Sequence, residues 1–399
     1  MKTNGAKRLH KPMAQSHGEA FLRLRSAILE DYSYRDLRGV DWKNRFARFG
    51  PGLRASSTTI QFAQGAARLL SAAQDVHLWL RVKNQTVPTY RRCAQWNVAL
   101  SMLPRLIPNW RQHNEVVMSG RFPDGIVYVC LRAWPGEAPA QLRPAYRLLR
   151  EAAATRQPLI IDVRANGGGA EPLAGRFAGC FIRRSVRYAK HLTLCAGALR
   201  GPMHRRLKPN QAGPHYRGRV AVLVGPGTVS SCESFVMMMR QAPGCKLIGA
   251  RTAGASGNPK PVDLGNGVVA FIPSWQDLDL EGGCIEGRGI APDIKVRPRW
   301  PSSRTCKGAS GAHDNTPRCR MNAAFRSQPE GRIHAAGGSQ GRKLSCSGAS
   351  VEGRCPVPST LDTRHSSSDP VLAVALAFLR GKGAARECRR TARTWPVAA

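Results

Sequence analysis

Short apolar runs without polar alternation are the sequence feature that most restricts how this chain can fold. Such runs are typical of strands buried on both faces of a parallel sheet, which needs helices to cover it. Amphipathic segments stand between them, as at 138–156, where Leu142, Tyr146, Leu149 and Ala153 share one helical face. We therefore predict an α/β fold with a largely parallel sheet. Its expected strands are 125–134, 158–164, 220–224, 246–250 and 267–273.

The rest of the chain divides by composition. Apolar positions recur at three- and four-residue spacing in 19–34 and 59–74, which predicts helices with a break at the Phe-Gly-Pro-Gly stretch 49–52. Ser, Gly, Arg and Cys dominate 301–366, where disorder is expected, whereas the apolar run in 369–381 predicts a core helix. The predicted organisation is a disordered basic N-terminus at 1–18, a helical N-terminal and cap region at 19–124, a core at 125–300, a poorly ordered insertion at 301–366, a C-terminal core helix at 367–381 and a basic tail at 382–399.

The net charge of the chain is large, but it does not by itself indicate a function. Lys and Arg outnumber Asp and Glu by 61 to 25, and the net charge of +36 would suit an anionic partner. The basic residues are spread along the chain and form no zinc-finger, RNP or basic-zipper pattern, so we expect no specific nucleic-acid partner. None of the 12 cysteines belongs to a Cys-x-x-Cys pair, which leaves a zinc site without support. We find neither an apolar signal core nor a membrane-spanning run, and a cytoplasmic location is the default expectation.

Three consecutive glycines at 167–169 follow the strand expected at 158–164. One or two glycines serve a turn, whereas three strip side chains from the backbone and leave N–H groups that can approach a ligand or a developing negative charge. A phosphate site and an oxyanion hole both use such donors. The stretch lacks the Lys-Ser/Thr ending of a P-loop and the spacing of a dinucleotide fingerprint, which favours the oxyanion hole.

Ser230 lies where the strand expected at 220–224 passes into a helix expected at 232–242. Glu233 follows three residues later, so a helix-capping box is one explanation of this serine. A nucleophile is the other, because backbone amides and the helix dipole at such a turn stabilise the oxyanion that serine attack produces. Ser231 is a second candidate nucleophile, although the register with Glu233 favours Ser230.

Four segments, in this order, resemble the core of the S41 peptidases, the C-terminal processing or tail-specific proteases. They are LIIDVRANGGG at 159–169, VAVLVGPGTVSSCESF at 220–235, LIGARTAGASGNP at 247–259 and IEGRGIAPDIKV at 285–296. The resemblance covers roughly 19–298 and the helix at 369–381. It implies a crotonase/ClpP-like spiral core and hydrolysis of peptide bonds through an acyl-enzyme, with a peptide or protein substrate and no metal or other cofactor. We recognise no separate PDZ-like module in 85–125.

The resemblance also implies how the serine is activated. In the processing-protease branch a Lys does so, but Ala255 stands at its place here, and the nearby Lys260 falls where we expect a loop. The branch that includes the tricorn core protease uses a His and a Glu, which His77 and Glu286 match. The serine that precedes this histidine in the tricorn pattern is Val76 here, so a hydroxyl relay through that position is lost.

By this resemblance, Ser230 attacks the scissile carbonyl, His77 transfers its proton to the leaving amine, and Glu286 orients the imidazolium. The amides of Gly169 and Ser231 bind the oxyanion.

Each assignment has an alternative. His77 has apolar neighbours, as a packed histidine without a chemical role would, and Glu286 is close enough in sequence to pair with Arg288 at a turn. Asp162, inside an expected strand, is assigned local hydrogen bonding only. For the whole chain the alternative is a catalytically inactive relative that binds peptides or another ligand. The sequence does not predict an oligomeric state.

Overall fold

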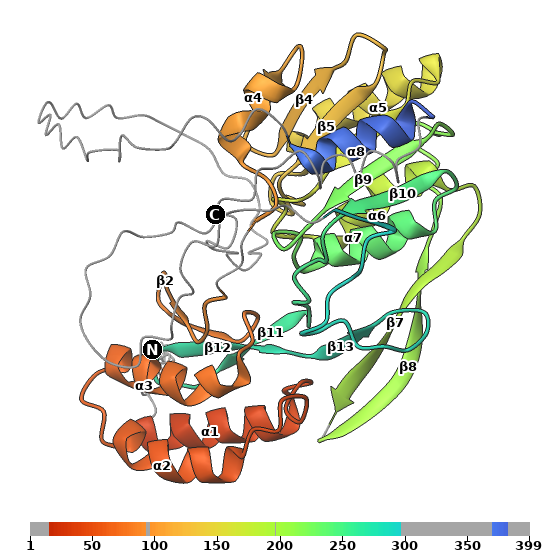
Figure 1. Cartoon of the computed structure of the whole chain (residues 1–399). Coiled ribbons are helices and arrows are strands. Elements are labelled where there is room, and N and C mark those ends of the chain that lie inside the picture. The colour runs from red at the N-terminus through yellow and green to blue at the C-terminus, as the bar shows by residue number, and fades with distance from the viewer. Residues whose placement is uncertain (1–15, 93–95, 196, 297–368, 382–399) are drawn as a thin grey trace, which may run out of the picture.

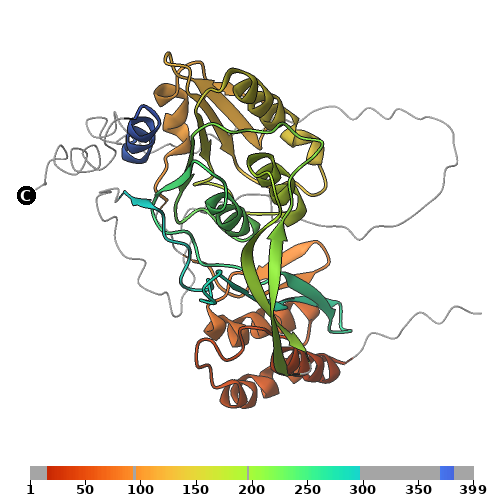
Figure 2. The same ribbon diagram turned by 90° about the vertical axis from the view of Figure 1, so that its right-hand side faces the viewer.

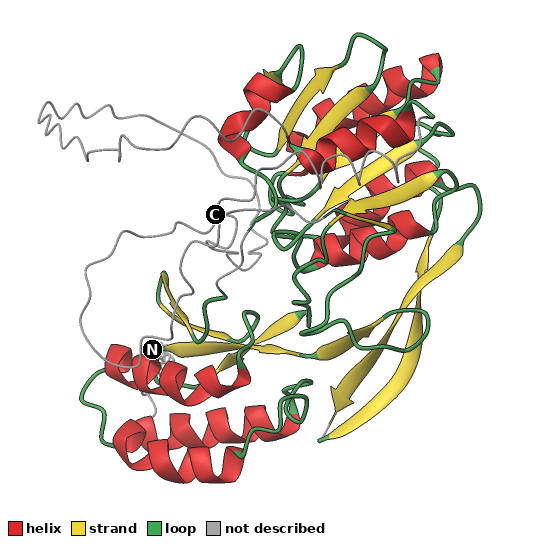
Figure 3. Ribbon diagram, viewed as in Figure 1, coloured by secondary structure: helices red, strands yellow, loops and turns green. Residues whose placement is uncertain are grey.

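The computed structural model describes residues 16–92, 96–195, 197–296 and 369–381. A large sheet with helices on both faces forms the upper part of the molecule in Figure 1, and a second layer of helices and smaller sheets lies below it. Figure 3 shows the same arrangement by secondary structure. The disorder expected for 1–15 and 301–366 and the basic tail expected at 382–399 lie outside the described residues.

The upper sheet has seven strands in the order β14-β10-β9-β6-β5-β4-β3. Neighbours from β14 to β5 are parallel, and β4 and β3 extend the sheet in antiparallel fashion. The prediction of an α/β fold with a largely parallel sheet is confirmed, but the strand expected at 267–273 belongs to a separate, antiparallel sheet. Its strands are β14 (Ile294–Lys295), β10 (Cys245–Gly249), β9 (Val220–Val224), β6 (Leu159–Asp162), β5 (Val127–Leu131), β4 (Val117–Arg121) and β3 (Arg111–Gln112).

Both faces of this sheet are buried, which explains the uninterrupted apolar runs. In β5, Val127 and Val129 pack on the side of α5, α6 and α7, whereas Tyr128 and Cys130 pack on the side of α4 and α8. Figures 1 and 2 show α8 on the face opposite α5, so a helix distant in sequence completes the core. The helices are α4 (Leu103–Leu106), α5 (Arg143–Thr155), α6 (Glu171–Ala178), α7 (Ser231–Arg240) and α8 (Pro370–Leu379), with 3-10 turns at Leu100–Met102, Pro139–Leu142 and Gly179–Phe181.

The lower layer packs three N-terminal helices against a four-stranded sheet in the order β11-β12-β1-β2. The first helix begins within the segment expected to be disordered, because Ser16 and Glu19 form a capping box. A 3-10 turn, Ser71–Ala73, follows the third. The elements are α1 (His17–Glu30), α2 (Trp42–Arg54), α3 (Thr59–Leu70), β1 (Trp79–Val82), β2 (Gln85–Pro88), β11 (Pro259–Asp263) and β12 (Val268–Pro273).

The break expected at 49–52 is wrong, because α2 continues through Pro51. Gly50 serves helix packing instead of a turn. A Cβ at Gly50 would lie 2.8 Å from the ring of Phe21, so its absence lets α1 and α2 approach each other. Pro51 has no N–H to donate to the carbonyl of Ala47, so the helix lacks one hydrogen bond there and ends three residues later at Arg54.

A third sheet, in the order β13-β7-β8, links the two layers. Its long hairpin runs down the right-hand side of Figure 1. Within the described residues, no helix is both long and apolar enough to cross a lipid bilayer. The strands are β7 (Val186–Cys195), β8 (Ala198–Leu207) and β13 (Trp275–Leu278).

A fully buried guanidinium fastens α8 to the sheet. Arg164, which has no exposed surface, pairs with Asp162 at 2.6 Å and with Asp369, the N-cap of α8, at 2.6 Å. It also donates to the carbonyl of Asn97 at 3.0 Å, and Asp162 accepts from the hydroxyl of Tyr128 at 2.7 Å. The local role expected for Asp162 is confirmed. Arg164 therefore joins the end of β6 to the last described helix.

We predict that Arg164→Met lowers the free energy of unfolding by about 3–5 kcal/mol, because two buried carboxylates lose their cation. Urea denaturation measures the change. Arg380→Met is the matched control, since the ion pair of Arg380 with Asp124 is exposed and worth at most about 1 kcal/mol. Equal losses in the two variants would contradict the prediction.

Candidate active site

Ser230 occupies a strained turn between β9 and α7. Its φ of 60° and ψ of −129° lie outside the regions that side-chain-bearing residues normally adopt. Two backbone bonds hold the turn: the N–H of Ser230 donates to Ala255 at 2.9 Å, and the N–H of Val229 donates to Asn166 at 3.0 Å. A sharp strand-to-helix turn of this kind lifts a serine hydroxyl out of the helix end, as in nucleophile elbows.

The capping box expected for Ser230 is wrong, because its side chain makes no cap hydrogen bond. Glu233 turns instead into the protein and is fully buried. Its carboxylate accepts from the hydroxyl of Thr252 at 2.5 Å and from the amides of Gly254 and Ala255 at 2.8 Å each. Burial raises the pKa of Glu233 to about 7. This carboxyl therefore stabilises the 252–255 loop, whose Ala255 carbonyl accepts from the N–H of Ser230.

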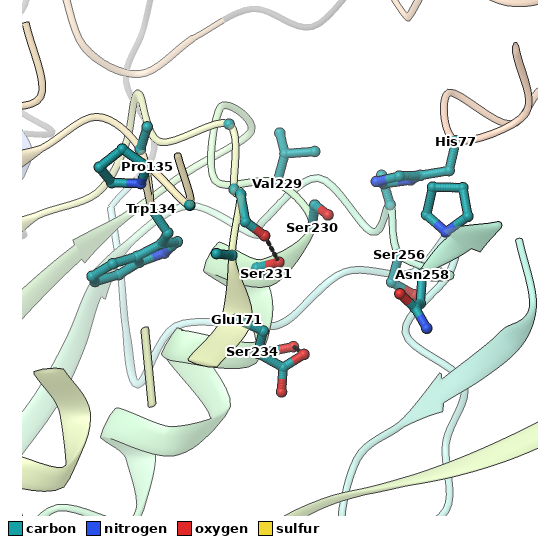
Figure 4. A pocket seen from close by; sticks show the side chains of 18 of the residues that line it. His77, Trp134, Pro135, Glu171, Val229, Ser230, Ser231, Ser234, Ser256 and Asn258 are labelled. Carbon is teal, nitrogen blue, oxygen red and sulfur yellow. Dashed lines mark hydrogen bonds between the residues drawn. The ribbon is translucent and has the colours of Figure 1, made fainter. Parts of the chain in front are cut away.

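The glycine run lies directly against the serine turn. The N–H of Trp134 donates to Gly168 and the N–H of Ala170 donates to Trp134, at 2.8 Å each, so Gly169 presents its own N–H to the other side. The hydroxyl of Ser231 donates to the carbonyl of Gly169 at 2.5 Å, drawn as a dashed line in Figure 4. Within the part of the chain that the structure describes, the N–H groups of Gly169 and Ser231 donate to no protein acceptor. Two neighbouring amides are thus available to a ligand.

His77 lies in the lower layer, just before β1, and shares one cleft with Ser230. In Figure 4 its ring points toward the hydroxyl of Ser230. The side chain is 1 % exposed, and burial lowers the pKa of His77 to about 4. The imidazole is therefore neutral at pH 7, the form that accepts a proton.

Asp75 is a functional candidate that sequence reasoning missed. Its carboxylate accepts from the N–H of His77 at 2.8 Å and from the hydroxyl of Tyr32 at 2.9 Å. Burial raises the pKa of Asp75 to about 6, although these donors oppose the shift. A short acidic side chain two residues before a histidine is the pattern of an Asx turn, and that signal could have found it.

Glu286 is a second buried carboxyl close to Asp75. Its carboxylate accepts from the amide of Ser256 at 2.8 Å and from the guanidinium of Arg38 at 3.1 Å. Burial, and then the charge of Asp75, raises the pKa of Glu286 well above its usual range. Two neighbouring buried carboxyls hold a single negative charge more easily than two.

The pairing of Glu286 with Arg288 that the sequence left open is wrong. Arg288 pairs with Asp279, and the cation beside Glu286 is Arg38 from the N-terminal region. A contact between residues 248 positions apart leaves no local sequence signal.

Ala255, at the place of the family's lysine, borders the serine turn through its carbonyl. Lys260, expected in a loop, lies in β11 opposite Ile272, on the side of the sheet that faces the N-terminal helices. Neither position 255 nor position 260 therefore places a lysine beside Ser230. Val76 lines the cleft next to His77, and Ser256 stands below the same ring in Figure 4. The hydroxyl of Ser256 shares a 2.8 Å hydrogen bond with that of Tyr34.

The sequence profile of peptidase family S41 matches residues 125–296. The core of this chain is therefore similar to peptidase family S41. The match contains the glycine run, the serine turn and Glu286, and His77 precedes it. Two relatives named "Probable CtpA-like serine protease", from Staphylococcus epidermidis and Staphylococcus haemolyticus, are each 26% identical over 147 residues. The alignments cover 36% of this chain and only 28% of each relative's length.

Solved structures show the same S41-type fold. A candidate peptidase from Parabacteroides merdae superposes with a TM-score of 0.60 at 22% identity, over 71% of this chain and 90% of its own. Mature CPAF gives a TM-score of 0.52 at 11% identity, over 70% of this chain and 93% of its own. At these identities the likeness concerns the fold alone.

We predict that Gly168→Ala lowers the free energy of unfolding by about 2–4 kcal/mol. The new Cβ would lie 2.8 Å from the Cβ of Ser230 and 2.9 Å from the carbonyl of Val229, at a φ of 98°. Gly167→Ala is the control, because a Cβ there meets nothing within 4 Å and should cost no stability. Denaturant unfolding of both variants tests the contrast, and a stable Gly168→Ala chain would refute it.

We predict that burial of His77 makes the protein less stable as the pH falls from 7 to 5. The unfolded chain then binds a proton at this ring that the folded chain, with the pKa of His77 near 4, does not bind. This contribution is about 2 kcal/mol over that range, and His77→Gln should remove it. Urea unfolding at both pH values compares wild type with His77→Gln and with His204→Gln at an exposed position. Parallel pH profiles in all three chains would contradict it.

Proposed function

We propose that this chain is a serine peptidase in which Ser230 is the nucleophile, His77 the general base and Glu286 the acidic partner. The observation that carries the proposal is the strained Ser230 turn, which stands beside the two unengaged amides of Gly169 and Ser231. Donors fixed in advance around a nucleophile are what acyl transfer needs, because they stabilise the charge that develops on the carbonyl oxygen. The match of residues 125–296 to the profile of peptidase family S41 supports the same reaction class.

The reaction would begin when the neutral His77 takes the proton of the Ser230 hydroxyl as its oxygen attacks the scissile carbonyl. The tetrahedral oxyanion would accept from Gly169 and Ser231. Collapse of this intermediate passes the proton to the leaving amine and leaves an acyl-enzyme on Ser230. Water, activated by the same ring, would then release the second product.

Burial alone makes His77 a weak base, since it opposes the imidazolium that the attack creates. A nearby negative charge favours that imidazolium. The pair of Asp75, bonded to the backbone of His77, and Glu286, bonded to the backbone of Ser256, holds one such charge between them in the same buried region. We assign Asp75 the role of a positioning residue. Glu286 is assigned an electrostatic role, in which its charge acts on the imidazole of His77 across the residues that surround the ring.

We predict that a fluorophosphonate probe labels the wild-type chain at Ser230, identified by mass spectrometry of the tagged peptide. Ser230→Ala should abolish labelling, and His77→Ala should slow it by at least about a hundredfold, because the hydroxyl loses its base.

Ser231→Ala is the matched control. Its hydroxyl already donates to Gly169, so the variant should still be labelled, at a rate reduced by no more than about tenfold. Labelling that moves to Ser231 would refute Ser230 as the nucleophile. A folded wild-type chain that binds peptide but takes no label would favour the inactive relative.

A further inference from the structure

One wall of the cleft is the face of a β-sheet. Strands β2, β1, β12 and β11 place every second residue on this side, and in each strand those residues line the cleft that holds Ser230. The alternate residues, such as Leu80 and Ala270, pack on the N-terminal helices. We call the first set the cleft wall: Trp79, Arg81, Thr86, Pro88, Pro261, Asp263, Val269 and Phe271.

The cleft wall is apolar at its centre. The rings of Trp79 and Phe271 stack 4.7 Å apart at 8°, and both side chains are partly exposed. The guanidinium of Arg81 lies 5.0 Å from the centre of the Phe271 ring. The wall also carries one basic and one acidic side chain, Arg81 and Asp263. A sheet face of this composition favours a large uncharged side chain over an ionic group.

The wall is continuous with the candidate active site. His77 lies two residues before Trp79, and both line the cleft with Gly169 and Ser230. An extended peptide whose carbonyl reaches the amide of Gly169 projects its side chains alternately to opposite sides. A residue close to the scissile bond can therefore face the cleft wall while the backbone stays at the glycine run.

We propose that the cleft wall is a substrate subsite that takes an aromatic or large aliphatic side chain of an extended peptide. The proposal rests on the proposed function for its substrate class. Binding at the wall does not itself require hydrolysis. Burying one such side chain accounts for a gain in affinity of about tenfold or more.

The test uses the full chain with Ser230→Ala, so that binding is measured without turnover. Fluorescein-labelled ten-residue peptides of Ala, Gly and Thr, each with one Phe at a successive position, are titrated by fluorescence anisotropy. We expect Phe at one or two positions to bind about tenfold tighter than the Phe-free peptide. Uniform affinity along the series would overturn the subsite.

Two further variants in the same background locate the gain. Phe271→Ala should abolish this gain, measured as the ratio of the affinities for the Phe-containing and the Phe-free peptides. Val269→Lys, which keeps the stacked rings but brings an ammonium group onto the wall, should do the same. Leu199→Ala, at an exposed apolar position on β8, is the control and should keep the gain. A gain that survives Phe271→Ala and Val269→Lys would place the subsite elsewhere.

Failure of the peptidase proposal would give a different result from failure of the subsite proposal. A wild-type chain that takes no fluorophosphonate while Ser230→Ala still binds the Phe peptide tightly would keep the subsite and remove the enzyme. Labelling at Ser230 without any preference for Phe would keep the enzyme and remove the subsite.

Discussion

Close backbone packing between two loops is the constraint on which the candidate site depends. The loops follow β6 and β9, adjacent parallel strands, so both emerge at one edge of the sheet. They touch without intervening side chains: a Cβ at Gly168 would come within 2.8 Å of Ser230, and one at Gly227 within 2.3 Å of the carbonyl of Arg164. This contact keeps Ser230 in its unusual backbone conformation and sets the amide of Gly169 next to that of Ser231. The three glycines are therefore explained by the approach of another chain segment, and not by the turn alone.

The residues proposed to activate the serine come mainly from the lower layer. His77 and Asp75 precede β1, and Arg38 lies between α1 and α2. Glu286 comes from the segment between β13 and β14, near the end of the core sequence. The cleft between the layers thus contains both Ser230, the proposed nucleophile, and His77, its proposed base, and the cleft wall includes the strand that follows His77. One sheet face would then both position the proton acceptor and select the substrate.

The sequence predicts the strands and helices of the core because doubly buried strands and amphipathic helices leave strong local patterns. It fails where tertiary contacts decide. Gly50 serves helix packing, so the expected break is absent. Glu233 forms no capping box and binds the loop at Thr252 instead. Asp75 and the pairing of Glu286 with Arg38 were missed for the same reason, since burial and contacts across 248 positions are invisible to local periodicity. Ser230 was a candidate from its place between a strand and a helix, whereas His77 and Glu286 were proposed only through resemblance to a family.

The attachment of α8 also bears on how such a chain can change over evolution. The last strand of the sheet ends at Lys295 and the helix starts at Pro370, and within the described residues Arg164 and the apolar side chains of α8 dock the helix onto the sheet. Each doubling of a flexible connection costs only about 0.6 kcal/mol in closure entropy. Insertions and deletions between these two points can therefore accumulate with little thermodynamic penalty, while the helix and its buried cation remain in place.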